Sequence, residues 1–222
     1  MDLTEIEFDP RLQTPFSILI CGPSSSGKTY FVKNVLQNHD HVIKSMPQNI
    51  VWIYTSMQPM YEELKKQNKG IKFVKGLPDS FDDESLFPQD QSHLIILDDL
   101  IFQASDHPEV VRIFTQYRHH RNMSVIMISQ NIFHQGKYSR AISLNSTHMI
   151  LFKNPRDQLQ VSVLANQVLP TKKKFFLEAF EDATRPPHGY LVVDLTPNCP
   201  EQYRLRTGIL PNQWPTVYLP KS

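Results

Sequence analysis

The chain has 222 residues, of which 40% are hydrophobic and 20% are charged, so it is long enough to build a domain with a well-buried core. Its 23 Lys and Arg residues are nearly balanced by 22 Asp and Glu residues, and the net charge of +1 excludes the strong overall positive field of many nucleic-acid-binding proteins. The longest apolar runs, such as FSILI, fall well short of the roughly 20 residues that span a bilayer, so we expect no membrane contact.

The two cysteines, Cys21 and Cys199, lie too far apart in the sequence to indicate a disulfide framework or a zinc site. The amino terminus, MDLTEIEFDP, has neither the cationic start nor the apolar stretch of a secretory signal. We therefore expect the chain to work in an intracellular, reducing environment.

Short apolar runs alternate with segments of helical periodicity, which is typical of a parallel sheet with crossover helices. The apolar runs predict strands at residues 16–21, 50–54, 71–74, 93–97, 123–129, 148–152, 190–194 and 203–207. The helical segments predict helices at residues 28–39, around 60–67, after 106, from the NPRD segment at 154–157 to about 168, and from 171 onward. The segment 77–92, with the acidic run DSFDDES and two prolines, predicts a solvated connection.

The predicted helix after residue 106 carries start signals. Asp106 is expected to be the N-cap, Pro108 lies early in the helix, and Glu109 occupies the capping-box position. An apolar stripe on this helix is expected to face the core, and it consists of Val110, Val111, Phe114 and Tyr117.

Neither an internal repeat nor a linker divides the chain, so we expect a single domain over residues 1–222. Residues 1–14 would form an N-terminal extension, and residues from about 208 to 222 would form an extended C-terminal arm. The arm and the segment before it contain prolines that exclude a helix or a central strand, at positions 197, 200, 211, 215 and 220. The arm either lies on a neighbouring subunit or straps its own domain.

The segment GPSSSGKT fits the pattern G-x-x-x-x-G-K-[ST] between an apolar strand and a helix. In such a loop backbone N–H groups converge on phosphates, Gly27 allows close approach, Lys28 reaches the β- and γ-phosphate oxygens, and Thr29 offers its hydroxyl to Mg²⁺. The alternative is a turn of small residues with an unrelated lysine. The sequence thus predicts that ATP and Mg²⁺ bind at a loop made of Gly22, Pro23, Ser24, Ser25, Ser26, Gly27, Lys28 and Thr29.

The segment HLIILDDL supplies two acids for this site. Its apolar residues predict a strand that delivers Asp98 and Asp99 to its carboxyl end, where ligands bind in parallel sheets. Asp98 is expected to hold Mg²⁺ through water, and Asp99 to polarise the attacking water. Many such ATPases have Glu at the second position, and the shorter Asp would need a water or a shifted strand. The alternative is a pair of solvated or capping acids.

The segment VIMISQN provides a third element, because Gln130 ends the next buried strand. If this strand lies between the two strands already named, the amide comes close to the γ-phosphate. It would there orient water and respond to hydrolysis. The alternative is a polar residue that merely closes a strand.

Four segments, GPSSSGKT, LIILDDL, HHRNMSVIMISQN and GKYSRAISLNSTHMILFKNPRD, resemble the genome-packaging ATPases of the FtsK and HerA superfamily. The similar branch is that of Polinton or Maverick elements, adintoviruses and related poxvirus-like DNA viruses. The resemblance covers the chain from about Phe16 to the VYLP near its end, and the last segment is the most specific. It implies an α/β P-loop NTPase sandwich of three layers, with a central, mainly parallel sheet that contains an additional strand.

The resemblance also implies a ring that pumps double-stranded DNA into a preformed capsid. Such rings place the nucleotide between subunits, so a neighbouring subunit must supply an arginine to the transferring phosphoryl group. The position in the family favours Arg121 or Arg118, just before the strand that ends in Gln130. Arg140 and Arg156 are the next candidates.

The partners that the resemblance implies are double-stranded DNA bound without sequence preference, further copies of this chain in a ring, and a viral capsid or its portal vertex. Lys137 and Arg140 would face the channel and contact phosphates. Lys172, Lys173 and Lys174 form a basic run that is better interpreted as a solvated helix face. The expected location is the nucleus or cytoplasm of an infected cell, or the virion.

Two other functions remain open. A nucleotide or small-molecule kinase shares the phosphate-binding loop and a similar size, although the sequence shows no arginine-rich lid. An ATP-dependent capsid assembly protein would bind the nucleotide and switch without translocating DNA.

Overall fold

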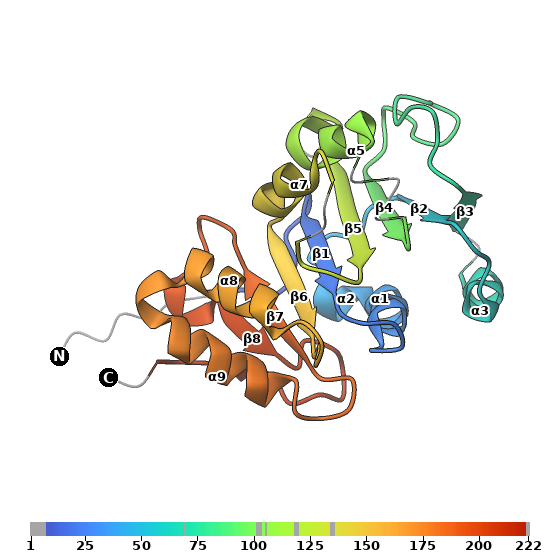
Figure 1. Cartoon of the computed structure of the whole chain (residues 1–222). Helices are drawn as coiled ribbons and strands as arrows, with labels where there is room; N and C mark the ends of the chain where they lie inside the picture. Colours follow the sequence, from blue (N-terminus) through green and yellow to red (C-terminus); the bar gives the residue numbers. More distant parts are fainter. Residues whose placement is uncertain are drawn as a thin grey trace.

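Nine strands form one sheet in the described part of the chain, which a computed structural model gives for residues 8–68, 70–100, 104, 106–117, 120–133 and 136–220. Their order is β3-β2-β4-β5-β1-β6-β7-β8-β9 (Figure 1). The pairings from β3 to β6 are parallel, and β7, β8 and β9 continue the sheet in antiparallel fashion. The strands are β1 (Ser17–Cys21), β2 (Asn49–Tyr54), β3 (Ile71–Lys75), β4 (His93–Asp98), β5 (Met123–Ser129), β6 (His148–Phe152), β7 (Tyr190–Asp194), β8 (Leu205–Thr207) and β9 (Thr216–Val217).

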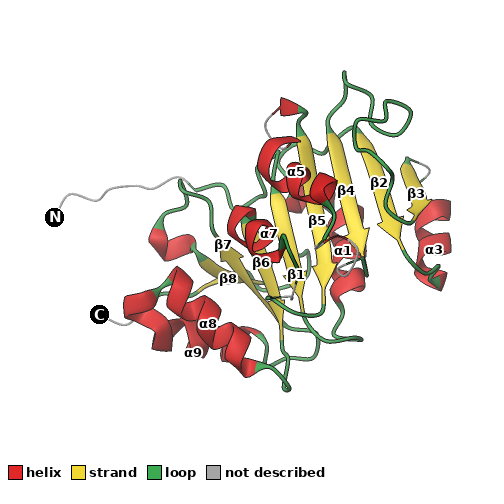
Figure 2. Ribbon diagram, turned by 45° about the horizontal axis from the view of Figure 1, so that its top comes forward, coloured by secondary structure: helices red, strands yellow, loops and turns green. Residues whose placement is uncertain are grey.

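Helices cover both faces of the sheet and so complete three layers (Figure 2). One face packs against α1 (Lys28–Gln37), α2 (His39–Val42) and α3 (Pro59–Gln67). The other packs against α5 (Pro108–Arg112), the π-helical turn η1 (Ile113–Tyr117), α7 (Ser139–Asn145), α8 (Gln158–Val168) and α9 (Lys173–Ala183). Two single turns, η2 (Pro170–Lys172) and η3 (Glu201–Tyr203), complete the described helical segments. The predicted fold class, a P-loop sandwich with a mainly parallel sheet, is confirmed.

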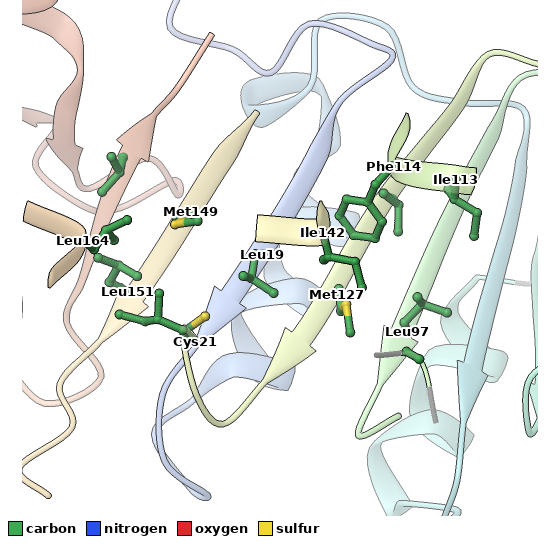
Figure 3. Close-up of a cluster of buried hydrophobic side chains, with 14 of the residues drawn as sticks. Leu19, Cys21, Leu97, Ile113, Phe114, Met127, Ile142, Met149, Leu151 and Leu164 are labelled. Carbon is green, nitrogen blue, oxygen red and sulfur yellow. The ribbon is translucent and has the colours of Figure 1, made fainter. Parts of the chain in front are cut away.

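The central strands are buried on both sides, which explains their continuous apolar sequences. In β1, Ile18 and Ile20 point to the face with α1, whereas Leu19 and Cys21 point to the face with α7 and α8. Figure 3 shows the second face, where Met127 and the ring of Phe114 lie between the sheet and its helices. Each strand therefore contributes to two cores, and its carboxyl end is held rigidly.

The predicted N-cap and capping box of the helix after residue 106 are wrong, whereas Pro108 lies in its first turn as predicted. The N-cap residue of α5 is His107, and no side chain caps the helix. The Asp106 carboxylate instead accepts a hydrogen bond from the backbone N–H of Lys137 at 2.8 Å. Glu109 forms an ion pair of 2.7 Å with Arg112 rather than a capping box. A tertiary contact with the loop before α7 has thus replaced the local cap.

The connection between β3 and β4 is irregular, as predicted. The prediction that it is a solvated segment is wrong for its two phenylalanines. Phe81 and Phe87 are fully buried, and their ring centroids lie 5.5 Å apart. The acidic residues between them remain exposed. Aromatic burial outweighs the entropic cost of ordering the loop, so this connection is anchored to the core.

The C-terminal arm returns to the sheet of its own chain. Its strand β9 pairs antiparallel with β8, with Val217 opposite Arg206 and Thr216 opposite Thr207. This pairing corresponds to the strap over its own domain. No helix within the described residues is both long and apolar enough to cross a bilayer.

Candidate active site

The loop between β1 and α1 is a close turn in which two glycines leave no room for a side chain. A Cβ atom on Gly22 would lie 2.7 Å from the Cβ of Phe152 and 2.8 Å from the Oγ of Ser26. Gly27 has a φ of 104°, and a Cβ there would lie 3.0 Å from Nδ1 of His188. Both positions of the sequence pattern therefore follow from close backbone approach and a left-handed turn.

The amino end of α1 is suited to an anion. The helix starts without a side-chain cap and without an acidic residue in its first turn, so its first N–H groups are left for another acceptor. The helix dipole places partial positive charge at the same point. Ser25, with a φ of 63°, turns the preceding backbone. Loop and helix end together form a phosphate cradle.

Lys28 lies folded into the loop. Its ammonium donates hydrogen bonds to the carbonyl oxygens of Gly22 and Pro23, both at 2.7 Å, and the residue is 8% exposed. Burial lowers the pKa of Lys28, and the nearby charges of Asp98 and Asp99 counteract this shift. An anion in the cradle would favour the charged ammonium in the same way.

Asp98 ends β4 as a buried carboxyl, 2% exposed. Its Oδ2 accepts a hydrogen bond from the hydroxyl of Tyr61 at 2.8 Å. Burial raises the pKa of Asp98 to about 6; the negative charge of Asp99 adds to the rise, while Tyr61, Lys28 and the Thr29 hydroxyl oppose it. Asp98 is therefore a carboxylate with too little positive charge around it.

This environment fits a hard divalent cation. The Thr29 hydroxyl and the Asp98 carboxyl lie together, and Mg²⁺ prefers such oxygen ligands together with water and phosphate oxygens. A cation here would also offset the cost of the buried Asp98 charge. No group of three or more His, Cys, Asp or Glu side chains that could hold a metal is found in the described residues. The site thus has the ligand count of a nucleotide-bound magnesium rather than that of an all-protein metal centre.

Asp99 has an uncommon backbone conformation next to the buried acid. Its φ of 58° lies in the left-handed region, which a residue other than glycine adopts at an energetic cost. The side chain is exposed and lines the same cavity as Lys28. The two consecutive acids both line the cavity but differ in burial, because Asp98 is buried and Asp99 is exposed.

Gln130 follows β5, which lies between β4 and β1 in the sheet. This confirms the condition on which its predicted place near the γ-phosphate depends. Gln130 lines a cavity of about 360 Å³ together with Lys28, Thr29, Asp98 and Asp99. The residues predicted separately from three segments of sequence thus line one cavity. The carboxyl ends of β1, β4 and β5, which carry them, lie at the same side of the sheet (Figure 1).

Three residues of the site have no sequence signal. Tyr61 on α3 contacts Asp98, and Gln58 and Tyr30 line the phosphate cavity. Tyr61 belongs to the buried stripe of its helix, where its ring packs 5.3 Å from that of Trp52. Only the tertiary structure shows that its hydroxyl reaches the acid at the end of β4.

The candidate arginines have different surroundings. Arg121 precedes the amino end of β5, at the edge opposite to the cavity, and donates hydrogen bonds to the Phe81 carbonyl at 2.8 Å and the Phe87 carbonyl at 3.0 Å. It also pairs with Asp82 at 2.6 Å and is 14% exposed at its side chain. These contacts tie down the connection between β3 and β4. Arg118 lies outside the described residues.

Arg140 and Arg156 are both exposed. Arg140 belongs to α7. Arg156 lines a separate, open cavity of about 630 Å³, which Ser24 and Gln130 of the phosphate site also line. Lys137, a predicted DNA contact, is exposed in the loop before α7. These three exposed cations thus lie in the loop before α7, on α7 itself and beside the phosphate loop.

Comparison with known proteins finds similarity in structure. No family model and no curated protein matches the chain. The genome packaging NTPase B204 of Sulfolobus turreted icosahedral virus 2, solved with sulfate, superposes with a TM-score of 0.56 at 13% identity, covering 96% of this chain and 98% of that chain. The same protein with ATP-gammaS gives a TM-score of 0.54 at 13% identity over 94% and 98% of the two chains.

A further solved structure is B204, described as the DNA-packaging ATPase from Sulfolobus turreted icosahedral virus. It has a TM-score of 0.55 and 12% identity, and the match covers 95% of this chain and all of that chain (100%). At such low identity the likeness shows a shared fold, which extends over nearly the whole length of both proteins.

Proposed function

We propose that this chain hydrolyses ATP in the cavity around Lys28 and uses the reaction to move double-stranded DNA into a viral capsid. The observation that carries the proposal is the meeting of the phosphate cradle, Asp98, Asp99 and Gln130 in one cavity. Burial lowers the pKa of Lys28 and raises the pKa of Asp98. Such shifts are expected of groups whose charges are balanced only when a charged ligand binds.

Each residue has a distinct role in the proposed hydrolysis. The loop N–H groups and Lys28 bind the phosphates, while Thr29 and Asp98 would hold Mg²⁺. When bound, Mg²⁺ neutralises charge on the phosphate oxygens. Asp99 accepts a proton from the attacking water, and Gln130 orients that water.

The fold neighbours support a nucleoside triphosphatase as the enzyme class. B204 is named a genome packaging NTPase and has been solved with ATP-gammaS. The finer assignment, to the FtsK and HerA packaging ATPases of the Polinton or Maverick branch, rests on the four sequence segments. The same proposal places the protein inside an infected cell, at a vertex of the capsid.

The proposed ring requires an arginine from a neighbouring subunit. We assign this role to Arg140 or Arg156, which are exposed, in preference to Arg121, whose guanidinium is engaged within its own chain. Lys137 and Arg140 are candidates for contact with DNA phosphates. Such contacts weaken as salt rises, without dependence on sequence.

The first experiment measures phosphate release from ATP with and without duplex DNA. The wild-type chain is expected to hydrolyse ATP slowly alone and faster with DNA. Lys28→Ala should abolish turnover. Lys33→Ala, on the same helix, removes an ion pair with the exposed Glu63 and a cation–π contact with the Tyr30 ring at 6.0 Å, and it should retain turnover. Unchanged turnover in Lys28→Ala would refute the site.

The same assay separates the other functions. Phosphate transfer to an added nucleoside monophosphate, with little hydrolysis, would identify a kinase. ATP-dependent oligomerisation without DNA-stimulated turnover would identify an assembly protein that does not translocate.

An experiment with mixed variant subunits tests whether Arg140 or Arg156 acts across the subunit interface. Lys28→Ala and Arg140→Ala subunits should each be inactive alone. Mixed, they should regain part of the turnover, because some interfaces then combine an intact Lys28 with an intact Arg140. Failure to recover with either Arg140→Ala or Arg156→Ala subunits would contradict a role of these arginines across the interface.

A further inference from the structure

A second cavity adjoins the phosphate cradle on the side away from Asp98. It has a volume of about 260 Å³, and Gly27 and Tyr30 line both this cavity and the phosphate cavity. The two spaces therefore meet at the first turn of α1. A ligand whose phosphates lie at Lys28 can extend from one space into the other.

The sheet order fixes which end of a nucleotide would enter this cavity. The acids and Gln130 come from β4 and β5, on one side of β1, so the terminal phosphate belongs on that side. The second cavity has Phe152 at the end of β6 and Tyr190 at the start of β7 in its lining, on the other side of β1. The rest of the nucleotide must therefore leave toward β6 and β7.

The chemistry of this cavity suits a flat aromatic ring. Its lining includes three packed aromatic side chains: Phe31 lies 4.8 Å from Tyr190 and 6.2 Å from Phe152, measured between ring centroids. Tyr30, which is 62% exposed, adds a further ring at the mouth. A volume just below the range of roughly 300 to 1,000 Å³ for drug-sized ligands fits a base better than a whole nucleotide.

His188 connects the cavity to the phosphate loop. It has a φ of 58°, in the left-handed region that is costly for residues other than glycine. Its Nδ1 lies 3.1 Å from the Ser26 carbonyl oxygen, and its ring borders Gly27. In this strained backbone conformation the exposed imidazole of His188 lies at the junction of the two cavities.

Polar groups of the C-terminal arm lie at the edge of the cavity. Oε1 of Gln213 accepts hydrogen bonds from the Tyr190 hydroxyl and, at 3.3 Å, from the backbone N–H of Leu210. Among the described residues its NH₂ group has no acceptor, so it can donate to a ligand. Asn212 lines the cavity beside it, with a φ of 66°. The arm can thus hydrogen-bond a base or ribose.

We propose that this cavity holds the base and ribose of the bound nucleoside triphosphate, with Tyr30 and His188 against the base and the arm residues Asn212 and Gln213 at its polar edge. This inference rests on the proposed function, because it places the remainder of the same nucleotide. It also gives the arm a role in nucleotide binding, because Asn212 and Gln213 precede β9.

The test compares ATP with inorganic tripolyphosphate, which has the phosphates but no nucleoside. Titration calorimetry with Mg²⁺ should show that wild-type protein binds ATP more tightly than tripolyphosphate. Tyr30→Ala should weaken ATP binding by about fivefold or more, the usual range for a lost base-stacking contact, and should affect tripolyphosphate binding much less. Tyr30→Phe keeps the ring and should retain ATP affinity.

The control is Trp214→Ala, which removes an 88% exposed aromatic ring from the arm outside this cavity and should change neither affinity. Asn212→Gly, which tolerates the left-handed backbone, should weaken ATP binding alone. Equal ATP affinity of wild type and Tyr30→Ala, or equal wild-type affinity for both ligands, would overturn the inference and leave the proposed function intact. Absence of binding of either ligand to wild type would instead refute the proposed function itself.

Discussion

Two buried aspartates, at opposite ends of the parallel strands, show how a ligand-binding site differs from a structural ion cluster. Asp98 ends β4 and is 2% exposed, and Asp194 ends β7 and is 5% exposed. Asp98 accepts a hydrogen bond from neutral Tyr61, whereas Asp194 lies 2.9 Å from Nη2 of Arg206 and 3.4 Å from Nε2 of His148. Only the second carboxylate has a buried cation in contact.

The pKa values differ accordingly. Burial raises the pKa of Asp98 to about 6, and its protein partners do not reverse this. Burial would raise the pKa of Asp194 too, but hydrogen bonds from His148 and Thr196 outweigh it and hold the pKa well below the ordinary value. The ion cluster of Asp194, Arg206 and His148 stabilises the antiparallel part of the sheet. Asp98, a buried carboxylate without a cation in contact, indicates the ligand-binding end of the parallel strands.

The largest effect is expected from Asp194→Ala. The change leaves Arg206 and His148 buried without their acceptor, which should lower the free energy of unfolding by about 3 to 5 kcal/mol. Urea denaturation at pH 7 measures this loss. Because the folded pKa is lowered, the Asp194 contribution is present above pH 3.8, the ordinary value, and is lost as the pH falls through the folded pKa. A loss below about 1 kcal/mol would remove the contrast with Asp98.

Arg121→Ala tests whether this arginine belongs to the structural edge. Its loss frees the buried carbonyls of Phe81 and Phe87, so the free energy of unfolding should fall by roughly 2 to 3 kcal/mol. ATP turnover per folded molecule should persist. Lost turnover with unchanged stability would instead support Arg121 as the arginine supplied to a neighbouring subunit.

Asp98→Asn should have the opposite sign. The folded pKa of about 6 exceeds the ordinary value of 3.8, so Asp98 favours folding below pH 3.8, and this contribution is lost as the pH rises through about 6. At pH 8 the amide should therefore raise the free energy of unfolding by up to about 3 kcal/mol while turnover disappears. At pH 3.5 the stabilities of the variant and the wild type should agree. Destabilisation at pH 8 would show that the carboxylate is already matched within the protein.

The smallest effect concerns Tyr61→Phe. The ring packing against Trp52 and Phe73 is retained, and only the hydrogen bond to Asp98 is lost. We expect a destabilisation of about 1 kcal/mol at pH 8. A double-mutant cycle with Asp98→Ala, which removes the acceptor that Asn would keep, should attribute most of it to the pair. An equal loss in both backgrounds would mean that the hydroxyl does not act through Asp98.

Local sequence was sufficient for much of the fold. The strands 123–129 and 148–152 coincide with β5 and β6, because buried strands have continuous apolar sequences with polar boundaries. Asp157 caps α8 by accepting a hydrogen bond from the Gln160 N–H, within the NPRD segment that was expected to begin this helix. The phosphate loop was predictable because the pattern of glycines, lysine and threonine is characteristic of a loop whose backbone binds phosphate.

Long-range contacts account for what the sequence did not predict. Asp106 has a cap-like position but binds Lys137, and Phe81 and Phe87 lie in an acidic connection yet enter the core. Tyr61 and Asp98 are 37 residues apart, and His188 contacts a carbonyl 162 residues away. Such partners depend on the sheet order, which local periodicity does not contain.

The most direct test of the account locates the cation. Crystals grown with Mn²⁺ in place of Mg²⁺ and a slowly hydrolysed ATP analogue give an anomalous signal at the metal. We predict one strong peak between the terminal phosphates, the Thr29 hydroxyl and the Asp98 carboxylate, with the ammonium of Lys28 moved from the loop carbonyls to the phosphates. Phosphates outside the cradle, or a metal remote from both Thr29 and Asp98, would contradict the proposed site.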